Sequence, residues 1–131
     1  MRMHVTMRPD GAHLYVEARG QFSLEEAKRT FLEILAAADL HDTENVLFDG
    51  LALSGQLTVM ERYAYGAFVA EAALGFARRH PRSATRFAYV LSEPVLDPAR
   101  FGETVAVNRG VHLRTFDNVE DALAWLGQGT A

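Results

Sequence analysis

The chain has 131 residues, of which 49% are hydrophobic, and it contains no cysteine. This length and composition predict a single domain over residues 1–131 with a hydrophobic core, and the lack of thiols excludes disulfides and thiolate metal sites. Thirteen basic residues against seventeen acidic ones give a net charge of -4, which argues against a surface for nucleic acid.

The first predicted element is a β-hairpin. Apolar and polar residues alternate over 3–8 and again over 13–19, which is the period of a half-buried strand. The tripeptide "PDG" at 9–11 separates the two runs, and proline followed by a flexible glycine is typical of a tight turn. The hairpin makes the first strand an antiparallel edge of the sheet.

Two helices with a capping box follow. Ser23 with Glu26 precedes apolar positions at helical spacing and predicts a helix over 24–40. Thr58 with Glu61 opens a long helix that runs to about residue 79 and stops before Pro81. Between them, "NVLF" predicts a short buried strand that ends at residue 49.

The remaining elements continue the alternation. "RFAYVLS" over 86–92 predicts a buried strand, and Asp97 is expected to cap a third helix with Pro98 at its first position. Gly110 suits the left-handed end of that helix, and "VHLRTF" predicts the last strand. The last helix covers "DNVEDALAWL", with Asp117 or Asn118 as its cap, and residues 127–131 are expected to form a frayed tail.

The predicted order, β-β-α-β-α-β-α-β-α, is that of an α/β fold with a mostly parallel sheet and right-handed crossovers. With "VLFDG", "ETVAVNRGVHLRTF" and "EDALAWL", it resembles the STAS or SpoIIAA-like superfamily over nearly the whole chain. This superfamily shares its fold with the lipid-binding CRAL-TRIO domains. The chain is most similar to a small bacterial branch whose members have no established enzymatic role.

The resemblance implies a non-enzymatic binding or regulatory domain that acts through protein contacts. A carrier or sensor of a small apolar or lipid-like ligand is the alternative, as the likeness to CRAL-TRIO domains implies. A hydrolase-like enzyme centred on Asp49 comes third. Under any of these readings the sequence indicates no cofactor.

One motif of the superfamily is altered here. Anti-sigma-factor antagonists carry an Asp-Ser-Ser-Gly-like motif whose first serine is phosphorylated by a kinase. In "ALSG" the aspartate is replaced by Ala52 and the phosphorylated serine by Leu53, while Ser54 and Gly55 match. We therefore expect no phosphorylation switch in the loop over 50–57. Modification of Ser54 or Thr58 stays open, although Thr58 is better explained as a helix cap.

Four residues form the predicted ligand site. Asp49 is expected at the carboxyl end of a central strand, where open α/β sheets place their ligands. Ser54, Thr58 and the loop after residue 92 would border the same cleft, and the resemblance gives Arg109 in "NRG" a role of unspecified kind. The alternative is that the Asp49 carboxylate only binds amides of its own loop.

The long helix is predicted to lie at an interface. Residues 63–77, "YAYGAFVAEAALGFA", contain a single charged residue, Glu71, so the helix needs cover on more than its sheet side. A small-residue stripe and a bulkier stripe should face the sheet and a partner, and the bulkier stripe consists of Tyr65, Phe68, Ala72 and Phe76. A homodimer is the expected partner; burial within the monomer or under an apolar ligand is the alternative.

Other sites are not indicated. The five histidines include no pair at the spacing of a helical metal site. There is also no phosphate-binding glycine loop and no nucleophile motif. No apolar run is long enough to span a bilayer, and the first residues do not resemble a signal peptide, so a cytoplasmic protein is expected.

Overall fold

The computed structural model describes residues 2–80, 86–97 and 99–128. It contains a five-stranded sheet in the spatial order β1-β2-β3-β4-β5. β1 (His4–Asp10) pairs antiparallel with β2 (His13–Gln21), and β2, β3 (Asn45–Ser54), β4 (Arg86–Leu91) and β5 (His112–Phe116) pair in parallel. The predicted α/β fold with an antiparallel edge strand is confirmed.

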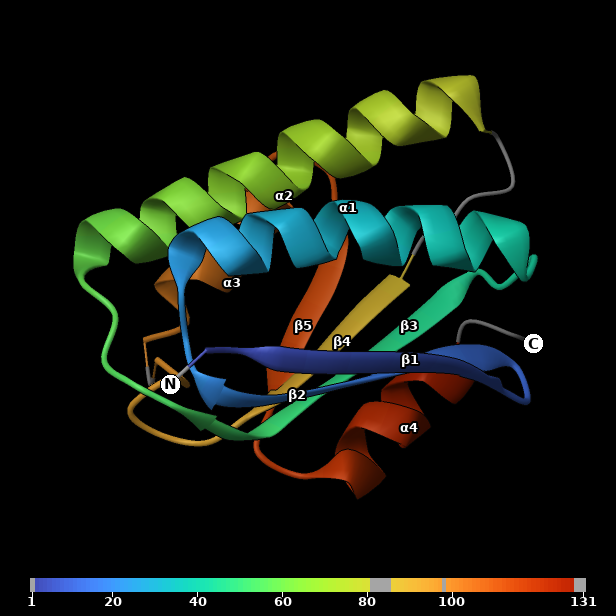
Figure 1. Ribbon diagram of the computed structural model, residues 1–131. Helices are drawn as coiled ribbons and strands as arrows, with labels where there is room; N and C mark the ends of the chain where they lie inside the picture. The colour runs from blue at the N-terminus through green and yellow to red at the C-terminus, as the bar shows by residue number, and fades with distance from the viewer. Residues whose placement is uncertain (1, 81–85, 98, 129–131) are drawn as a thin grey trace.

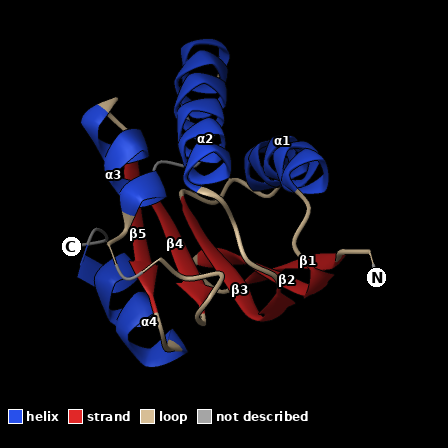
Figure 2. Ribbon diagram, turned by 90° about the vertical axis from the view of Figure 1, so that its left-hand side faces the viewer, coloured by secondary structure: helices blue, strands red, loops and turns tan. Residues whose placement is uncertain are grey.

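Three helices cover one face of the sheet. α1 (Leu24–Leu40), α2 (Val59–Arg79) and α3 (Phe101–Asn108) lie above it, and α4 (Val119–Gln128) lies below (Figures 1 and 2). From β2 to β5, each strand is added on the same side of the one before it. Three right-handed crossovers must then all pass over the same face of the sheet. α4 follows the last strand and is free to cover the opposite face.

The two long helices begin where the caps predict. Thr58 and Glu61 form the reciprocal capping box of α2, with the Glu61 amide 3.0 Å from Thr58 Oγ1 and the Thr58 amide 2.8 Å from Glu61 Oε1. Ser23 accepts the Glu26 amide at 3.3 Å as the cap of α1. The Glu26 carboxylate does not complete that box, because it pairs with the Arg2 guanidinium at 3.4 Å.

Several predicted boundaries are wrong. β3 continues to Ser54 rather than ending at residue 49, because β2 extends to Gln21 and supplies hydrogen-bond partners for the longer strand. α3 begins at Phe101, not at Pro98, which lies outside the described residues. α4 reaches Gln128, so the first two residues of the expected tail are helical.

The predicted cap of α3 is wrong, because the residue before the helix is Arg100, whose side chain makes no cap hydrogen bond. The Asp97 carboxylate instead supports the preceding turn, where it accepts the Ala99 amide at 3.0 Å and the Phe101 amide at 2.9 Å. Asn118 accepts the Asp121 amide at 2.8 Å, which resolves the choice of cap for α4. Gly110 has a φ of 101°, the left-handed conformation expected after α3.

α2 stands off the sheet. Among the described residues, its backbone neighbours lie in α1 and α3 and not in any strand, and Figure 2 shows it raised between these two helices. Gly66 makes this packing close, because a Cβ there would lie 2.5 Å from the Gly102 carbonyl oxygen of α3. Side chains must therefore fill the space between α2 and the sheet.

Candidate functional site

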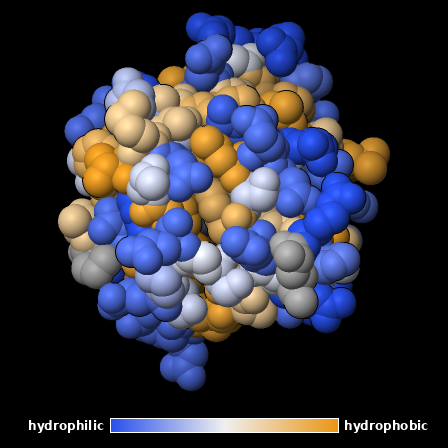
Figure 3. Space-filling model, turned by 60° about the vertical axis from the view of Figure 1, so that its left-hand side comes forward, coloured by the Kyte–Doolittle hydropathy of each residue, from blue (hydrophilic) through white to orange (hydrophobic). Residues whose placement is uncertain are grey.

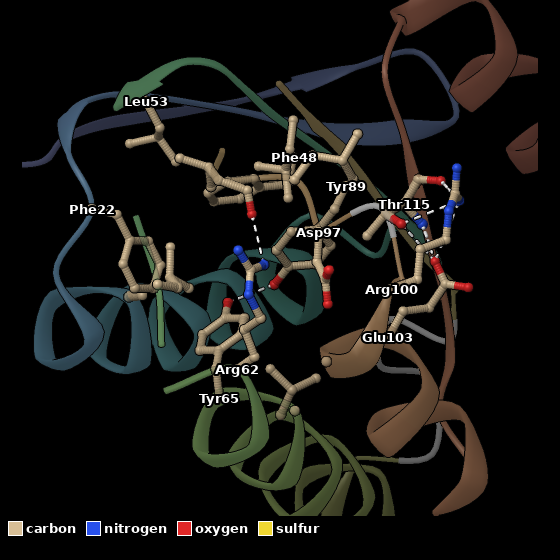
Figure 4. Close-up of a pocket in the computed structure, with 18 of the residues that line it drawn as sticks. Phe22, Phe48, Leu53, Arg62, Tyr65, Tyr89, Asp97, Arg100, Glu103 and Thr115 are labelled. Carbon is tan, nitrogen blue, oxygen red and sulfur yellow. Dashed lines mark hydrogen bonds and ion pairs between the residues drawn. The ribbon is translucent and has the colours of Figure 1, made fainter. Parts of the chain in front are cut away.

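The side chains beneath α2 do not fill that space completely. A pocket of about 90 Å³ lies between α1, α2, α3 and the carboxyl-terminal halves of β3, β4 and β5. Its lining is mainly apolar, and each of these elements contributes to it: Ala27 of α1, Tyr65 of α2, Gly102 of α3, Phe48 of β3, Tyr89 of β4 and Leu113 of β5. Figure 4 shows the aromatic side chains of this lining. Figure 3 looks toward this end of the molecule and shows apolar side chains reaching the surface among polar ones.

Strand periodicity decides which residues reach the pocket. Successive side chains of a strand point to opposite faces of the sheet. Phe48 and Tyr89 therefore face the helices and line the pocket, whereas Leu47 and Ala88 face α4 and belong to the core on that side. The pocket therefore lies on the face of the sheet that α1, α2 and α3 cover.

Aromatic rings form the centre of the pocket wall. The Phe48 and Tyr89 rings stack with centroids 4.7 Å apart, and Tyr65 meets Tyr89 edge to face at 6.3 Å. Phe22 meets Tyr65 edge to face at 6.4 Å. The Tyr65 and Tyr89 hydroxyl oxygens are 2.7 Å apart and share a hydrogen bond, which links α2 to the sheet.

Burial keeps both hydroxyls protonated. Loss of solvation raises the pKa of Tyr65 above its usual value of 10.0. Burial is also the main reason why the pKa of Tyr89 is raised well above 10.0, and the nearby Tyr65 adds to this shift. Both side chains are therefore neutral at physiological pH, and they can donate hydrogen bonds but cannot act as phenolate bases.

Polar groups line one side of the pocket, and they bind one another or the backbone. Arg62 donates to the Pro94 and Val95 carbonyl oxygens at 2.9 Å and 3.0 Å. The Phe101 amide, and to a smaller extent the Ala99 amide, holds the pKa of Asp97 below its usual 3.8.

Glu103 is the centre of a second polar group beside the first (Figure 4). Its carboxylate accepts the Thr115 amide and hydroxyl, both at 2.7 Å. Arg100 lies 3.7 Å from the same carboxylate and donates to the Thr115 carbonyl oxygen. These charges fix α3 to β5 and are already engaged within the chain.

The pocket lining contains no histidine and no serine among the described residues. Its Thr115 hydroxyl is hydrogen-bonded to Glu103. The described residues also include no group of three or more histidine, cysteine, aspartate or glutamate side chains placed to hold a metal ion. No helix in the described part of the chain is long and apolar enough to cross a membrane.

The four residues predicted to form a ligand site are not brought together at this pocket. Asp49 lies in the middle of β3 on the opposite face, where it accepts the Tyr15 hydroxyl at 2.7 Å and the Leu51 amide at 3.2 Å. Ser54 donates to the Gly20 carbonyl oxygen at 3.3 Å, and Thr58 caps α2. The Arg109 guanidinium lies 3.3 Å from the Tyr63 hydroxyl. Their role in binding stays a prediction.

The residues predicted for an interface have neighbours within the chain. Tyr65, Phe68, Ala72 and Phe76 are partly buried and pack against the core below α2. The outward face of α2 carries other apolar side chains: Met60 is 72% exposed, Tyr63 41% and Leu74 40%. The homodimer itself stays a prediction.

Sequence reasoning missed the tyrosine pair. Tyr89 was assigned only to a buried strand, and Tyr65 only to the outer stripe of a helix. One signal was present, because a tyrosine inside the apolar run "RFAYVL" must bury its hydroxyl, and buried hydroxyls need partners. The partner comes from α2, and only the packing of that helix identifies it.

Comparisons with known proteins agree with this architecture. Residues 13–127 match the model of the SpoIIAA-like family. An anti-sigma factor antagonist from Mycobacterium paratuberculosis superposes with a TM-score of 0.58 at 11% identity, covering 96% of this chain and 95% of that one. An uncharacterised protein with a SpoIIAA-like fold from Shewanella loihica gives a TM-score of 0.49 at 17% identity, with 95% and 93% covered. No curated protein matches the sequence.

Proposed function

Because the chain belongs to the SpoIIAA-like family, we propose that it is a non-enzymatic binding domain that holds a small, largely apolar ligand beneath α2. The observation that carries this proposal is the pocket of about 90 Å³ lined mainly by aromatic and aliphatic side chains. An apolar pocket with a few polar groups is the usual form of a small-molecule site. Its place at the carboxyl ends of parallel strands is also where α/β folds bind ligands.

The volume of the pocket limits the size of the ligand that it can enclose. An engineered apolar cavity of about 150 Å³ binds benzene, and this pocket, at about 90 Å³, is smaller. The part of a ligand that is fully enclosed is therefore no larger than one small ring. A longer molecule would leave its remainder outside the enclosed volume.

A titration with the hydrocarbon methylenecyclopentane, followed by methyl NMR, tests this function. Binding should shift the signals of Leu53 and Val69, which line the pocket, and leave Leu126 on the opposite face unchanged. Leu57→Trp should abolish the shifts, because Leu57 lines the pocket and the indole would occupy it. The matched control is Leu51→Trp, since Leu51 is 40% exposed on β3 and does not line the pocket.

The proposal fails if the wild-type signals show no saturable shift up to the solubility of the hydrocarbon. It also fails if Leu57→Trp binds as well as the control. Native mass spectrometry of the freshly purified protein adds a second readout, because a bound ligand would appear as a mass above that of the chain.

Contact with another protein is the second candidate function. The exposed apolar side chains on the outward face of α2 favour it, with Met60 and Leu74 at 72% and 40% exposure. The fold is also that of the anti-sigma factor antagonist described above. Exposed apolar surface of this kind is commonly covered by a partner, and a two-fold homodimer is the commonest arrangement.

Analytical ultracentrifugation decides the homodimer. We expect a wild-type dimer at micromolar concentration that Leu74→Glu dissociates, because a charge would be placed in the covered surface. Leu40→Glu is the matched control, since Leu40 is 79% exposed at the end of α1. A wild-type monomer at that concentration would exclude the homodimer.

A further inference from the structure

The hydroxyl pair beneath α2 has one hydrogen more than it uses. Each tyrosine hydroxyl carries a single hydrogen and can also accept. Tyr65 and Tyr89 share one hydrogen bond, with their oxygens 2.7 Å apart. Whichever of the two donates, the hydrogen of the other is left without a partner among the described residues.

The structure shows no other acceptor for that hydrogen among the described residues. Tyr89 is only 5% exposed and Tyr65 is partly buried, and the rings of Phe48 and Phe22 lie against the pair. The Glu103 carboxylate also lines the pocket, but it accepts from Thr115 and makes no hydrogen bond to either tyrosine. An unpaired buried donor costs about 1–3 kcal/mol, so an acceptor that enters the pocket gains from meeting it.

We propose that the Tyr65–Tyr89 pair is the recognition element of the pocket and that its ligand is an apolar molecule with one uncharged acceptor oxygen, such as a ketone. This inference rests on the proposed ligand-binding function and adds the chemical class of the ligand. An anionic head is disfavoured, because a buried charge needs a partner. The Arg62 guanidinium already faces the Asp97 carboxylate, and two of its five N–H groups donate to backbone carbonyl oxygens.

The donor count determines which variant tests the proposal. Removing one hydroxyl, as in Tyr89→Phe, breaks the bond within the pair and frees the hydrogen of the remaining tyrosine. A single variant therefore still offers one donor to the ligand. Only the double variant Tyr65→Phe/Tyr89→Phe removes every donor, and replacing both partners of a hydrogen bond by apolar groups of the same shape is nearly neutral for stability.

The experiment compares two probes of nearly equal shape, cyclopentanone and methylenecyclopentane, which differ in the acceptor oxygen. Their dissociation constants are measured by NMR titration for the wild type, both single variants and the double variant. Comparing each probe between proteins cancels its own cost of leaving water. We expect the double variant to bind the ketone roughly tenfold more weakly, the value of one net hydrogen bond. Its affinity for the hydrocarbon should change less than twofold.

A direct signal in the wild-type protein makes the test independent of variants. With ¹³C at the tyrosine ζ carbon, the ketone should shift the resonance of Tyr65 or Tyr89 more than the hydrocarbon does. This measurement decides the matter even if the double variant does not fold.

The outcomes separate the two proposals. Suppose that the hydrocarbon binds the wild type. If the double variant then weakens ketone binding no more than hydrocarbon binding, or if the ketone shifts neither ζ carbon in the wild type, the tyrosine pair does not recognise the ligand. The proposed ligand-binding function survives that result. If neither probe binds the wild type, both proposals are wrong.

Discussion

The two faces of the sheet differ in the number of helices that cover them. α1, α2 and α3 cover one face with a large core that includes Phe31, Ile34 and Phe87. The other face has α4 alone, which contacts β3, β4 and β5 and buries a small cluster around Leu47 and Leu126. The comparison teaches that the number of covering helices decides the chemistry of the hollow: the pocket beneath three helices is mainly apolar, whereas the one beside α4 and the end of β5 is lined mostly by polar and charged residues.

The same comparison explains the polar residues of the other face. α4 makes no contact with β1 or β2 among the described residues, so side chains there remain near solvent. Asp49 and Tyr15 can pair at 2.7 Å without the cost of full burial. On the face covered by α1, α2 and α3, Tyr89 is buried and Tyr65 is partly buried, and their hydroxyls bond to each other.

The largest expected loss of stability comes from substitutions in the cores on the two faces of the sheet. Phe31 is fully buried and its ring lies 5.3 Å from that of Phe87, so Phe31→Ala should lower the free energy of unfolding by about 3–5 kcal/mol. Leu126→Ala should cost about 2–3 kcal/mol, because the smaller cluster under α4 relaxes more easily. Urea denaturation measures both, and a larger loss from Leu126→Ala would reverse the ranking of the two faces.

The close packing of α2 on α3 gives the next effect. Gly66→Ala should cost about 1–3 kcal/mol, because its new Cβ would lie 2.5 Å from the Gly102 carbonyl oxygen and would force the helices apart. Gly75→Ala is the control on the same helix. The nearest atom to its Cβ would be an Arg78 nitrogen at 3.8 Å, so it should stabilise the protein by about 0.5–1 kcal/mol. Equal melting temperatures for the two variants would contradict this packing.

A smaller effect is expected from Asp49→Asn on the open face. The pKa of Tyr15 is raised from 10.0 to about 12, mainly by its hydrogen bond to Asp49 and to a smaller extent by burial. That stabilisation is present below pH 10.0 and is lost as the pH rises through about 12. The variant should lower the free energy of unfolding by about 1 kcal/mol at pH 7. It should also bring the pKa of Tyr15 back toward 10.0, which a titration monitored by ultraviolet absorbance measures.

The same variant discriminates between the two roles of Asp49. If Asp49 only supports the strand and its loop, the affinity of the pocket for methylenecyclopentane should stay unchanged. A loss of binding without a loss of stability would instead make Asp49 a ligand residue.

The smallest effect concerns Asp97 at the start of α3. Backbone amides lower the pKa of Asp97 from its ordinary 3.8, so its contribution to stability is present above pH 3.8 and is lost as the pH falls through the lowered value. Asp97→Asn should cost about 0.5–1 kcal/mol at pH 7, the typical net worth of a hydrogen bond. The difference from the wild type should shrink in denaturation experiments as the pH falls below 3.8. A difference that does not depend on pH would show that the charge of Asp97 is not involved.

Local signals were sufficient to predict most of the fold. The bounds of α1 and α2 follow from Ser23, Thr58 and the helical spacing after them, because a cap acts on amides only a few residues away. The alternation before and after "PDG" predicted the hairpin in the same way. Errors occurred where a neighbour far along the chain decides the boundary, as when β2 supplies the partners that extend β3 to Ser54.

The sequence by itself determined the order of the elements, the caps of the long helices and the parallel sheet with its antiparallel edge. It could not determine the candidate site, because each local pattern states only whether a residue is buried and not which residue it meets. Tyr65 and Tyr89 are 24 positions apart and become partners at 2.7 Å only because α2 rests on α1 and α3 above the sheet. Asp49 lies outside the pocket for a local reason, since a strand residue next to Phe48 must point to the opposite face; which face holds the pocket is decided by the helices.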